Sequence, residues 1–152
     1  MRINIAAIGK FKNSSEKDIF HSYIKRIPWQ VVLKESETKK HSTTDQMKEA
    51  EAALLLASIP KASKIIALDE RGKDISSSEL AGLIESWQNE GTGSVAFIIG
   101  GADGLSQTIR NKADFILSFG KLTWPHMLVR AMLAEQIYRI YSIISGHPYH
   151  RG

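Results

Sequence analysis

The feature that most constrains the fold is an apolar stretch that runs directly into a glycine-rich one. Residues 94–99 (SVAFII) are apolar after Ser94, a run typical of a strand buried on both faces of a sheet. Gly100, Gly101 and Gly104 follow at once. Glycines let a backbone adopt positive φ and approach a ligand closely, and ligands of parallel sheets bind at the carboxyl ends of strands. A tight turn would need the same residues, so a ligand loop and a simple turn both stay open.

This glycine loop does not match the known phosphate-binding sequences. Its letters, GGADG, have neither the spacing of G-x-G-x-x-G nor the Gly-Lys-Ser/Thr ending of a P-loop. It also follows the fourth expected strand, whereas a dinucleotide fingerprint usually follows the first, where Ile8-Gly9-Lys10 offers nothing similar. A nucleotide-dependent enzyme such as a dehydrogenase therefore lacks its usual sequence support.

The rest of the chain alternates between strand and helix patterns. Strands are expected at 2–8, 29–35, 64–68, 94–99 and 114–118, and helices at about 15–27, 46–58, 76–89, 105–112 and 126–145. We expect a mobile loop at 36–44, a turn at 69–74, and Pro125 as the first residue of the last helix. This alternation predicts an α/β fold, a mostly parallel sheet with helices on both faces, in a single domain over 1–152.

Composition narrows the possible functions. The 152 residues contain no cysteine, which excludes a disulfide framework, a thiolate zinc site and a catalytic thiol. The N-terminus does not match a secretory signal, and no stretch approaches the ~18 apolar residues of a membrane helix, so we expect a soluble, cytoplasmic protein. The net charge of +4 permits a polyanionic partner such as RNA but does not demand one.

The last expected helix is apolar over an unusually wide arc. With about 100° per residue, its polar side chains gather in one stripe and the apolar ones fill the opposite side. The stripe holds Glu135, Gln136, Arg139 and Ser142, and the arc holds Met127, Leu133, Ala134, Ile137, Tyr138, Ile140, Tyr141 and Ile144. So wide an arc predicts burial on two sides, one by the core and one by a partner subunit.

Three features of this C-terminal region allow more than one interpretation. Arg130 falls in the middle of the apolar arc, where it would form a buried ion pair or reach the rim, or else face a ligand pocket or a dimer seam. Glu135 and Arg139 are spaced i, i+4 and would form at least a solvated helix pair. The tail 146–151 (GHPYHR) is either disordered or, with its aromatic ring and cationic donors, suited to hold a nucleotide.

Five segments together carry a resemblance to a known family. They are ALDERGK (67–73), FIIGGADGL (97–105), LSFGKLTWPH (117–126), VRAMLAEQIYR (129–139) and GHPYHR (146–151). In this order and at this chain length they resemble the SPOUT-class ribosomal RNA large subunit methyltransferase H family, which methylates N3 of a pseudouridine. Any one segment alone would be weak, but the combination is specific and spans essentially the whole chain.

The resemblance implies a fold, a cofactor and partners. It implies an α/β fold with a C-terminal trefoil knot, a homodimer, S-adenosylmethionine bound in the knot, and large-subunit ribosomal RNA as substrate, without a metal or a membrane. The cofactor-binding residues carried over by motif are Leu68, Gly100, Phe119, Gly120, Lys121, Leu122, Thr123 and Trp124. Loop backbone groups would bind the adenosine edges, while the leucine and tryptophan side chains supply apolar cover.

The implied reaction assigns roles to the remaining polar residues. The ring N3 of a pseudouridine carries a proton that must be lost around methyl transfer, so the site needs alignment plus a base or a cationic environment. The expected catalytic residues are His150, Tyr149 and Glu135, and the expected RNA contacts are Arg130, Arg139, His147 and Arg151. The tail is expected to act across the dimer, on the cofactor of the other subunit.

Two further alternatives stay open within the same fold. One is a SPOUT methyltransferase that acts on tRNA or on a different rRNA base, because RNA targets are chosen largely by shape. The other is a non-catalytic RNA-binding module, which would have no affinity for the cofactor.

Overall fold

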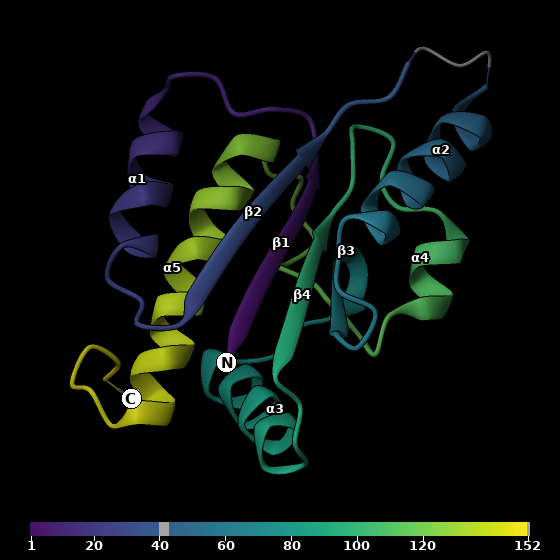
Figure 1. Cartoon of the computed structure of the whole chain (residues 1–152). Coiled ribbons are helices and arrows are strands. Elements are labelled where there is room, and N and C mark those ends of the chain that lie inside the picture. The colour runs from purple at the N-terminus through teal and green to yellow at the C-terminus, as the bar shows by residue number, and fades with distance from the viewer. Residues whose placement is uncertain (40–42, 152) are drawn as a thin grey trace.

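The computed structural model describes residues 1–39 and 43–151. Within them, five parallel strands form one sheet in the order β2-β1-β4-β3-β5 (Figure 1). The strands are β1 (Arg2–Ile8), β2 (Gln30–Ser36), β3 (Lys64–Lys73), β4 (Ser94–Ile99) and β5 (Phe115–Leu117). The helices are α1 (Ser15–Ile24), α2 (Thr44–Ala57), α3 (Ser77–Asn89), α4 (Gln107–Lys112) and α5 (His126–Ser145). The α/β fold with a parallel sheet is confirmed.

Alternation along the strands gives each face of the sheet its own core. Ile5 of β1 and Phe97 of β4 belong to the cluster packed with α1, α3 and α5, while Ala6 and Ile98 belong to a smaller cluster packed with α2 and α4. Successive side chains of a strand point to opposite faces, so helices on both faces require strands that are apolar throughout. Figure 1 shows the two groups of helices on the two sides of the sheet.

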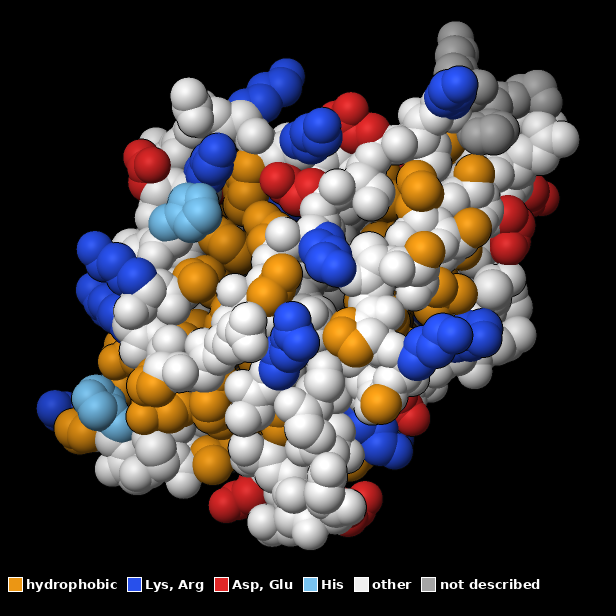
Figure 2. Space-filling model, viewed as in Figure 1, with side chains coloured by type: hydrophobic (Ala, Val, Ile, Leu, Met, Phe, Trp, Pro, Cys, Tyr) orange, Lys and Arg blue, Asp and Glu red, His pale blue; other side chains and the backbone are white. Residues whose placement is uncertain are grey.

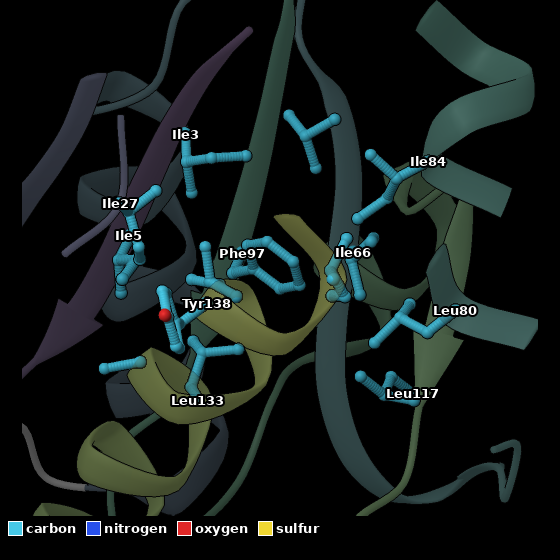
Figure 3. Packing of buried hydrophobic residues seen from close by; sticks show 14 of the residues in the cluster. Ile3, Ile5, Ile27, Ile66, Leu80, Ile84, Phe97, Leu117, Leu133 and Tyr138 are labelled. Carbon is cyan, nitrogen blue, oxygen red and sulfur yellow. The ribbon is translucent and has the colours of Figure 1, made fainter. Parts of the chain in front are cut away.

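Helix α5 is the centre of the larger core. It packs against both α1 and α3 (Figure 1). Figure 3 shows Phe97 of β4 near Leu133 and Tyr138 of α5, and Ile84 of α3 belongs to the same cluster. Fully burying one such side chain contributes about 1.5–3 kcal/mol. The wide apolar arc expected for this helix is therefore explained on one side by two helices and the sheet.

The helix starts follow local capping rules. At α3, the Ser76 hydroxyl accepts from the Glu79 N–H at 3.1 Å and the Glu79 carboxylate accepts from the Ser76 N–H at 2.7 Å, so the expected capping box is present. Pro125 differs from expectation, because it occupies the N-cap position with ψ of 137° and α5 begins at His126. The helix ends at Gly146, whose φ of 76° is left-handed.

The segment expected as a turn at 69–74 instead belongs mostly to β3, which corrects the sequence prediction. Leu68 and Lys73 both pair with Leu117 of β5, so the residues between them bulge out of the sheet and return. A Cβ on Gly72 would lie 2.5 Å from the Ile116 carbonyl oxygen, so only glycine fits where the strand returns. Polar residues at the end of a strand have the sequence pattern of a turn. Here they form a strand because they pair with β5, which is distant in the chain.

Three further sequence predictions concern the loop at 36–44, membrane-spanning helices and the knot. The loop at 36–44 includes residues 40–42, which lie outside the described residues, while Ser36 ends β2 and Thr44 begins α2. In the described part of the chain, no helix combines the length and the apolar character that crossing a membrane requires. The trefoil knot stays a prediction.

Candidate active site

A cleft of about 490 Å³ lies at the carboxyl ends of β3 and β4, beside the segment that follows β5. Its walls include the glycine loop 100–104, the segment after β5, and the first turn of α5. A pocket of this size suits a small organic ligand. Its position is the one where parallel α/β sheets bind their ligands.

The glycine loop is both a tight turn and a wall of the cleft. The Gly104 N–H donates to the Gly101 carbonyl oxygen at 3.0 Å, and Gly104 has a φ of +83°. A Cβ on Gly100 would lie 2.8 Å from Cδ2 of Leu105. The two interpretations of this loop are thus compatible, because the turn brings bare backbone to the surface of the cleft.

The segment after β5 is held in a curl by its own polar groups. The Ser118 hydroxyl donates to the Gly120 carbonyl oxygen and accepts from the Gly120 N–H, both at 3.0 Å. The Trp124 indole N–H donates to the Phe119 carbonyl oxygen at 3.2 Å. Leu122 is 73% exposed and Trp124 37% exposed. The curl therefore presents large apolar side chains at the mouth of the cleft.

The structure brings together nearly all of the expected cofactor-binding residues. Leu68, Gly100, Phe119, Gly120, Leu122, Thr123 and Trp124 line the cleft. Lys121 belongs to the same segment, but it is exposed and does not line the cleft. These residues come from three separate parts of the chain, so the fold alone accounts for their meeting.

Sequence reasoning did not single out the polar wall of the cleft. Arg71 and Asp69, both lining residues, form a bidentate pair in which Nε donates at 3.0 Å and Nη2 at 2.8 Å. Burial raises the pKa of Asp69, but the hydrogen bonds from Arg71 outweigh burial and hold the pKa below its usual value. Arg110 adds a longer contact of 3.8 Å. The sequence signal that could have identified this polar wall was the DER triplet at 69–71, directly after an apolar strand.

Arg130 corrects one expectation. Its side chain has no exposed surface, and it donates to the Glu35 carboxylate at 2.6 Å and to the carbonyl oxygens of Ile8 and Gly9 at 2.7 and 2.8 Å. Burial lowers the pKa of Arg130, and Glu35 opposes that effect. The buried ion pair is therefore the interpretation that the structure shows, and Arg130 is withdrawn from the expected RNA contacts because RNA cannot reach it.

A second polar cluster forms where the tail folds back onto α5. The Glu135 carboxylate oxygen Oε1 accepts from Arg139 Nη2 at 2.6 Å and from the Tyr149 hydroxyl at 3.0 Å. The Arg139 guanidinium also lies 4.8 Å from the centre of the Tyr149 ring. The Glu135–Arg139 pair, which was expected to be solvated, is thus half-buried. The C-terminal tail packs against this pair. We call Glu135, Arg139, Tyr149 and His150 the tail cluster.

Both ring nitrogens of His150 contact polar side chains. Arg139 Nη1 lies 3.1 Å from Nδ1, and the Ser78 hydroxyl lies 3.4 Å from Nε2. A guanidinium can only donate, so Nδ1 is the acceptor in the contact with Arg139. His150 is therefore held between α5 and the start of α3.

Tyr149 has an altered acidity. Burial raises the pKa of its hydroxyl, and the hydrogen bonds with Tyr23 and Glu135 raise it further. The phenol is therefore a proton donor to Glu135 rather than a base. Conversely, the hydrogen bond from Arg139 to Glu135 raises the pKa of Arg139, so this cation stays charged.

The remaining tail residues lie around this cluster. His147 is exposed and its Nδ1 accepts from the Tyr149 N–H at 3.2 Å, while Arg151 is exposed. A second pocket of about 340 Å³ includes Glu135 and shares Leu117 and Phe119 with the cleft. Glu135 lies nine residues after His126, about 14 Å along the helix. The tail cluster and the cleft are therefore neighbouring but distinct in one chain.

Basic side chains are spread over one face of the molecule, as Figure 2 shows for Lys and Arg. The described residues also contain no group of three or more His, Cys, Asp or Glu side chains placed to hold a metal ion.

Comparison with known proteins gives consistent matches. Residues 1–150 match the family described as predicted SPOUT methyltransferase. A protein of Paramagnetospirillum magneticum named ribosomal RNA large subunit methyltransferase H is 52% identical over 151 residues, covering 99% of both chains. A protein of the same name from Rhodospirillum centenum is 46% identical, again with 99% of both chains covered.

Solved structures agree on the fold. A probable methylase family protein from Haemophilus influenzae Rd KW20 superimposes with a TM-score of 0.59 at 12% identity, covering 99% of this chain and 70% of that one. A protein studied for 2-OH methylation of C/U34 on tRNA gives 0.54 at 14% identity, covering 95% and 97%. At these identities the likeness shows the fold alone. The sequence matches carry the conclusion: this chain belongs to the SPOUT methyltransferases, in the family of the ribosomal RNA large subunit methyltransferase H proteins.

Proposed function

We propose that this protein methylates N3 of a pseudouridine in large-subunit ribosomal RNA, in the cytoplasm, with S-adenosylmethionine as methyl donor. The observation that carries the proposal is the single cleft that collects seven of the eight expected cofactor residues. Relatives at 52% and 46% identity over nearly the whole chain bear the name of a large-subunit rRNA methyltransferase, which supports this substrate class.

The residues of the cleft fit this cofactor. A Cβ on Gly100 would collide with Leu105 at 2.8 Å, so the wall there consists of bare backbone that can bind the polar edges of a nucleoside. Leu68 and Trp124 supply apolar cover for its ring. S-adenosylmethionine, when bound, supplies an electrophilic methyl group on a sulfonium.

The tail cluster would prepare the acceptor base. Oε1 of Glu135 already accepts from Arg139 and Tyr149, so Glu135 would orient Arg139. Arg139 remains cationic and would favour the deprotonated ring of the acceptor electrostatically. Nδ1 of His150 already accepts from Arg139, so His150 would take the ring proton only after releasing that contact. We therefore assign the main role to Arg139 and a secondary one to His150.

The separation of the cleft and the tail cluster supports a homodimer as the working unit. Leu122 and Trp124 expose apolar surface at the cleft mouth, which a second copy would cover. In such a dimer the tail of one subunit would complete the cleft of the other. Arg139, His147 and Arg151 would then contact RNA.

Methyl transfer from labelled S-adenosylmethionine to ribosomes of a strain lacking this gene tests the proposal, with the product nucleoside identified by mass spectrometry. We expect label on N3 of a pseudouridine in large-subunit rRNA. Label on another base or on tRNA would instead favour a different SPOUT activity. Cofactor binding without any transfer would refute the substrate, and absence of both would favour an RNA-binding module.

A further inference from the structure

One buried carboxylate lies directly behind the glycine loop. Glu51 of α2 is 7% exposed, and its Oε1 has no hydrogen-bond partner among the described residues. A Cβ on Gly101 would lie 2.6 Å from Oε2 of Glu51. The absence of a side chain at Gly101 therefore lets this carboxylate approach the backbone of the cleft wall.

The position of Glu51 is costly unless something compensates for it. A buried carboxylate with an unpaired oxygen loses solvation without gaining a partner. Burial raises the pKa of Glu51, and the nearby charge of Asp103 raises it further. Asp103 itself lines the cleft. Glu51 does not line the cleft itself, so one acidic group lies on the wall and the other directly behind it, and a cation bound at this wall would relieve both.

A basic residue lies beside this acidic pair. Lys48, one helical turn before Glu51 on α2, also lines the cleft. The cleft spans both sides of the sheet, because α2 covers one face while α5, which contributes His126, covers the other. The α2 end of the cleft thus has acidic and basic groups together, in addition to the polar wall of Asp69 and Arg71, and the part next to α5 has the apolar side chain of Trp124.

We propose that the α2 end of the cleft is a subsite for the zwitterionic amino-acid portion of the ligand. Asp103 and, through the bare backbone of Gly101, Glu51 would attract its ammonium group, and Lys48 would attract its carboxylate. Glu51 acts at short range through a low-dielectric wall, where charge interactions are strong. This inference rests on the proposed function, which requires a cofactor with such an amino-acid end.

Isothermal titration of the full chain with two related ligands separates this role from general support of the loop. S-adenosylhomocysteine carries the amino-acid end, and 5′-methylthioadenosine lacks it. For Glu51→Gln, we expect affinity for S-adenosylhomocysteine to fall about tenfold, with affinity for 5′-methylthioadenosine unchanged within about twofold. The matched control is Glu49→Gln, which removes the same charge from the same helix at an exposed position and should alter neither.

The outcomes distinguish this inference from the proposed function. Equal weakening of both ligands by Glu51→Gln would show that Glu51 only supports the loop, and would overturn the subsite. Unchanged affinities would overturn it too. If the unsubstituted protein bound neither ligand, the proposed cofactor itself would fail. Asp103→Asn provides a second test, since its exposed position removes any concern about folding, and it should weaken S-adenosylhomocysteine selectively.

Discussion

Helix α5 carries two arginine–glutamate ion pairs that have the same N···O distance, 2.6 Å, in different surroundings. Arg130 is 0% exposed and holds Glu35, whereas Arg139 is 26% exposed and holds Glu135. Arg130 uses Nη2 on the carbonyl oxygens of Ile8 and Gly9, while its Nε has no partner among the described residues. Arg139 uses its other donor on a histidine of the tail.

The comparison teaches that distance alone does not define what an ion pair does. The Arg130 pair joins three elements in the interior, so its removal would leave buried acceptors without donors. The Arg139 pair is reachable from solvent and organises three side chains with acid–base chemistry. We therefore expect the first pair to govern stability and the second to govern activity.

The largest expected effect is on folding. Arg130→Ala should lower the free energy of unfolding by about 3–5 kcal/mol, because it leaves the Glu35 carboxylate without its cation and two carbonyl groups without this donor. Urea denaturation followed by circular dichroism measures this loss. Arg139→Ala is the matched control on the same helix and should cost less than about 1 kcal/mol. Equal losses for the two variants would contradict the comparison.

The second effect is on activity. Arg139→Ala should slow methyl transfer roughly 10²-fold, because the cation that favours the deprotonated acceptor is lost, while the dissociation constant of the cofactor stays unchanged. Single-turnover kinetics and calorimetry measure the two quantities. Arg139→Lys should restore only part of the rate, since an ammonium keeps the charge without the bidentate geometry. A parallel loss of cofactor affinity would instead assign Arg139 to the scaffold.

A smaller effect is expected at alkaline pH. The pKa of Tyr149 is raised in the folded protein, so its contribution to stability is complete below the ordinary tyrosine value of about 10. It is then lost as pH rises from that value through the higher folded pKa. Tyr149→Phe should remove this alkaline slope while keeping the ring contacts. Thermal unfolding across this pH range measures it, and an unchanged slope in the variant would refute the assignment.

The smallest effect concerns a third arginine pair, Arg71 with Asp69, whose arginine is 57% exposed. Arg71→Ala should cost less than about 1 kcal/mol. The pKa of Asp69 lies below its ordinary value, so its contribution is present above about pH 3.9 and is lost as pH falls through the folded pKa. Acid unfolding should begin at slightly higher pH in the variant. A cost equal to that of Arg130→Ala would show that exposure does not rank these pairs.

The fold could be predicted where the pattern is local. The residues of β1 and β4 alternate or run apolar without interruption, and both strands have the predicted bounds. The capping box at Ser76 could also be predicted, because Ser76 and Glu79 are only three residues apart. The continuation of β3 to Lys73 could not be predicted, since it depends on pairing with Leu117, far along the chain.

The site could be predicted in part for the same reason. The glycine loop and the segment 119–124 stand out in sequence, and the resemblance connects them to one ligand. The partner of Arg130 could not be inferred, because Glu35 is 95 residues away. Glu51 was missed although it is a charged residue within the apolar second half of α2; that contrast was the available signal.

The position of β1 has a consequence for how the chain folds during synthesis. β1 pairs with β4, whose first residue lies about ninety positions later, and α1 is covered by α5, the last helix. Contacts between such distant segments form slowly, since a long loop must close before they are gained. The apolar faces of β1 and α1 therefore stay partly exposed until α5 has been synthesised. A nascent chain that stops before α5 would expose the larger apolar face and should be a preferred client of chaperones.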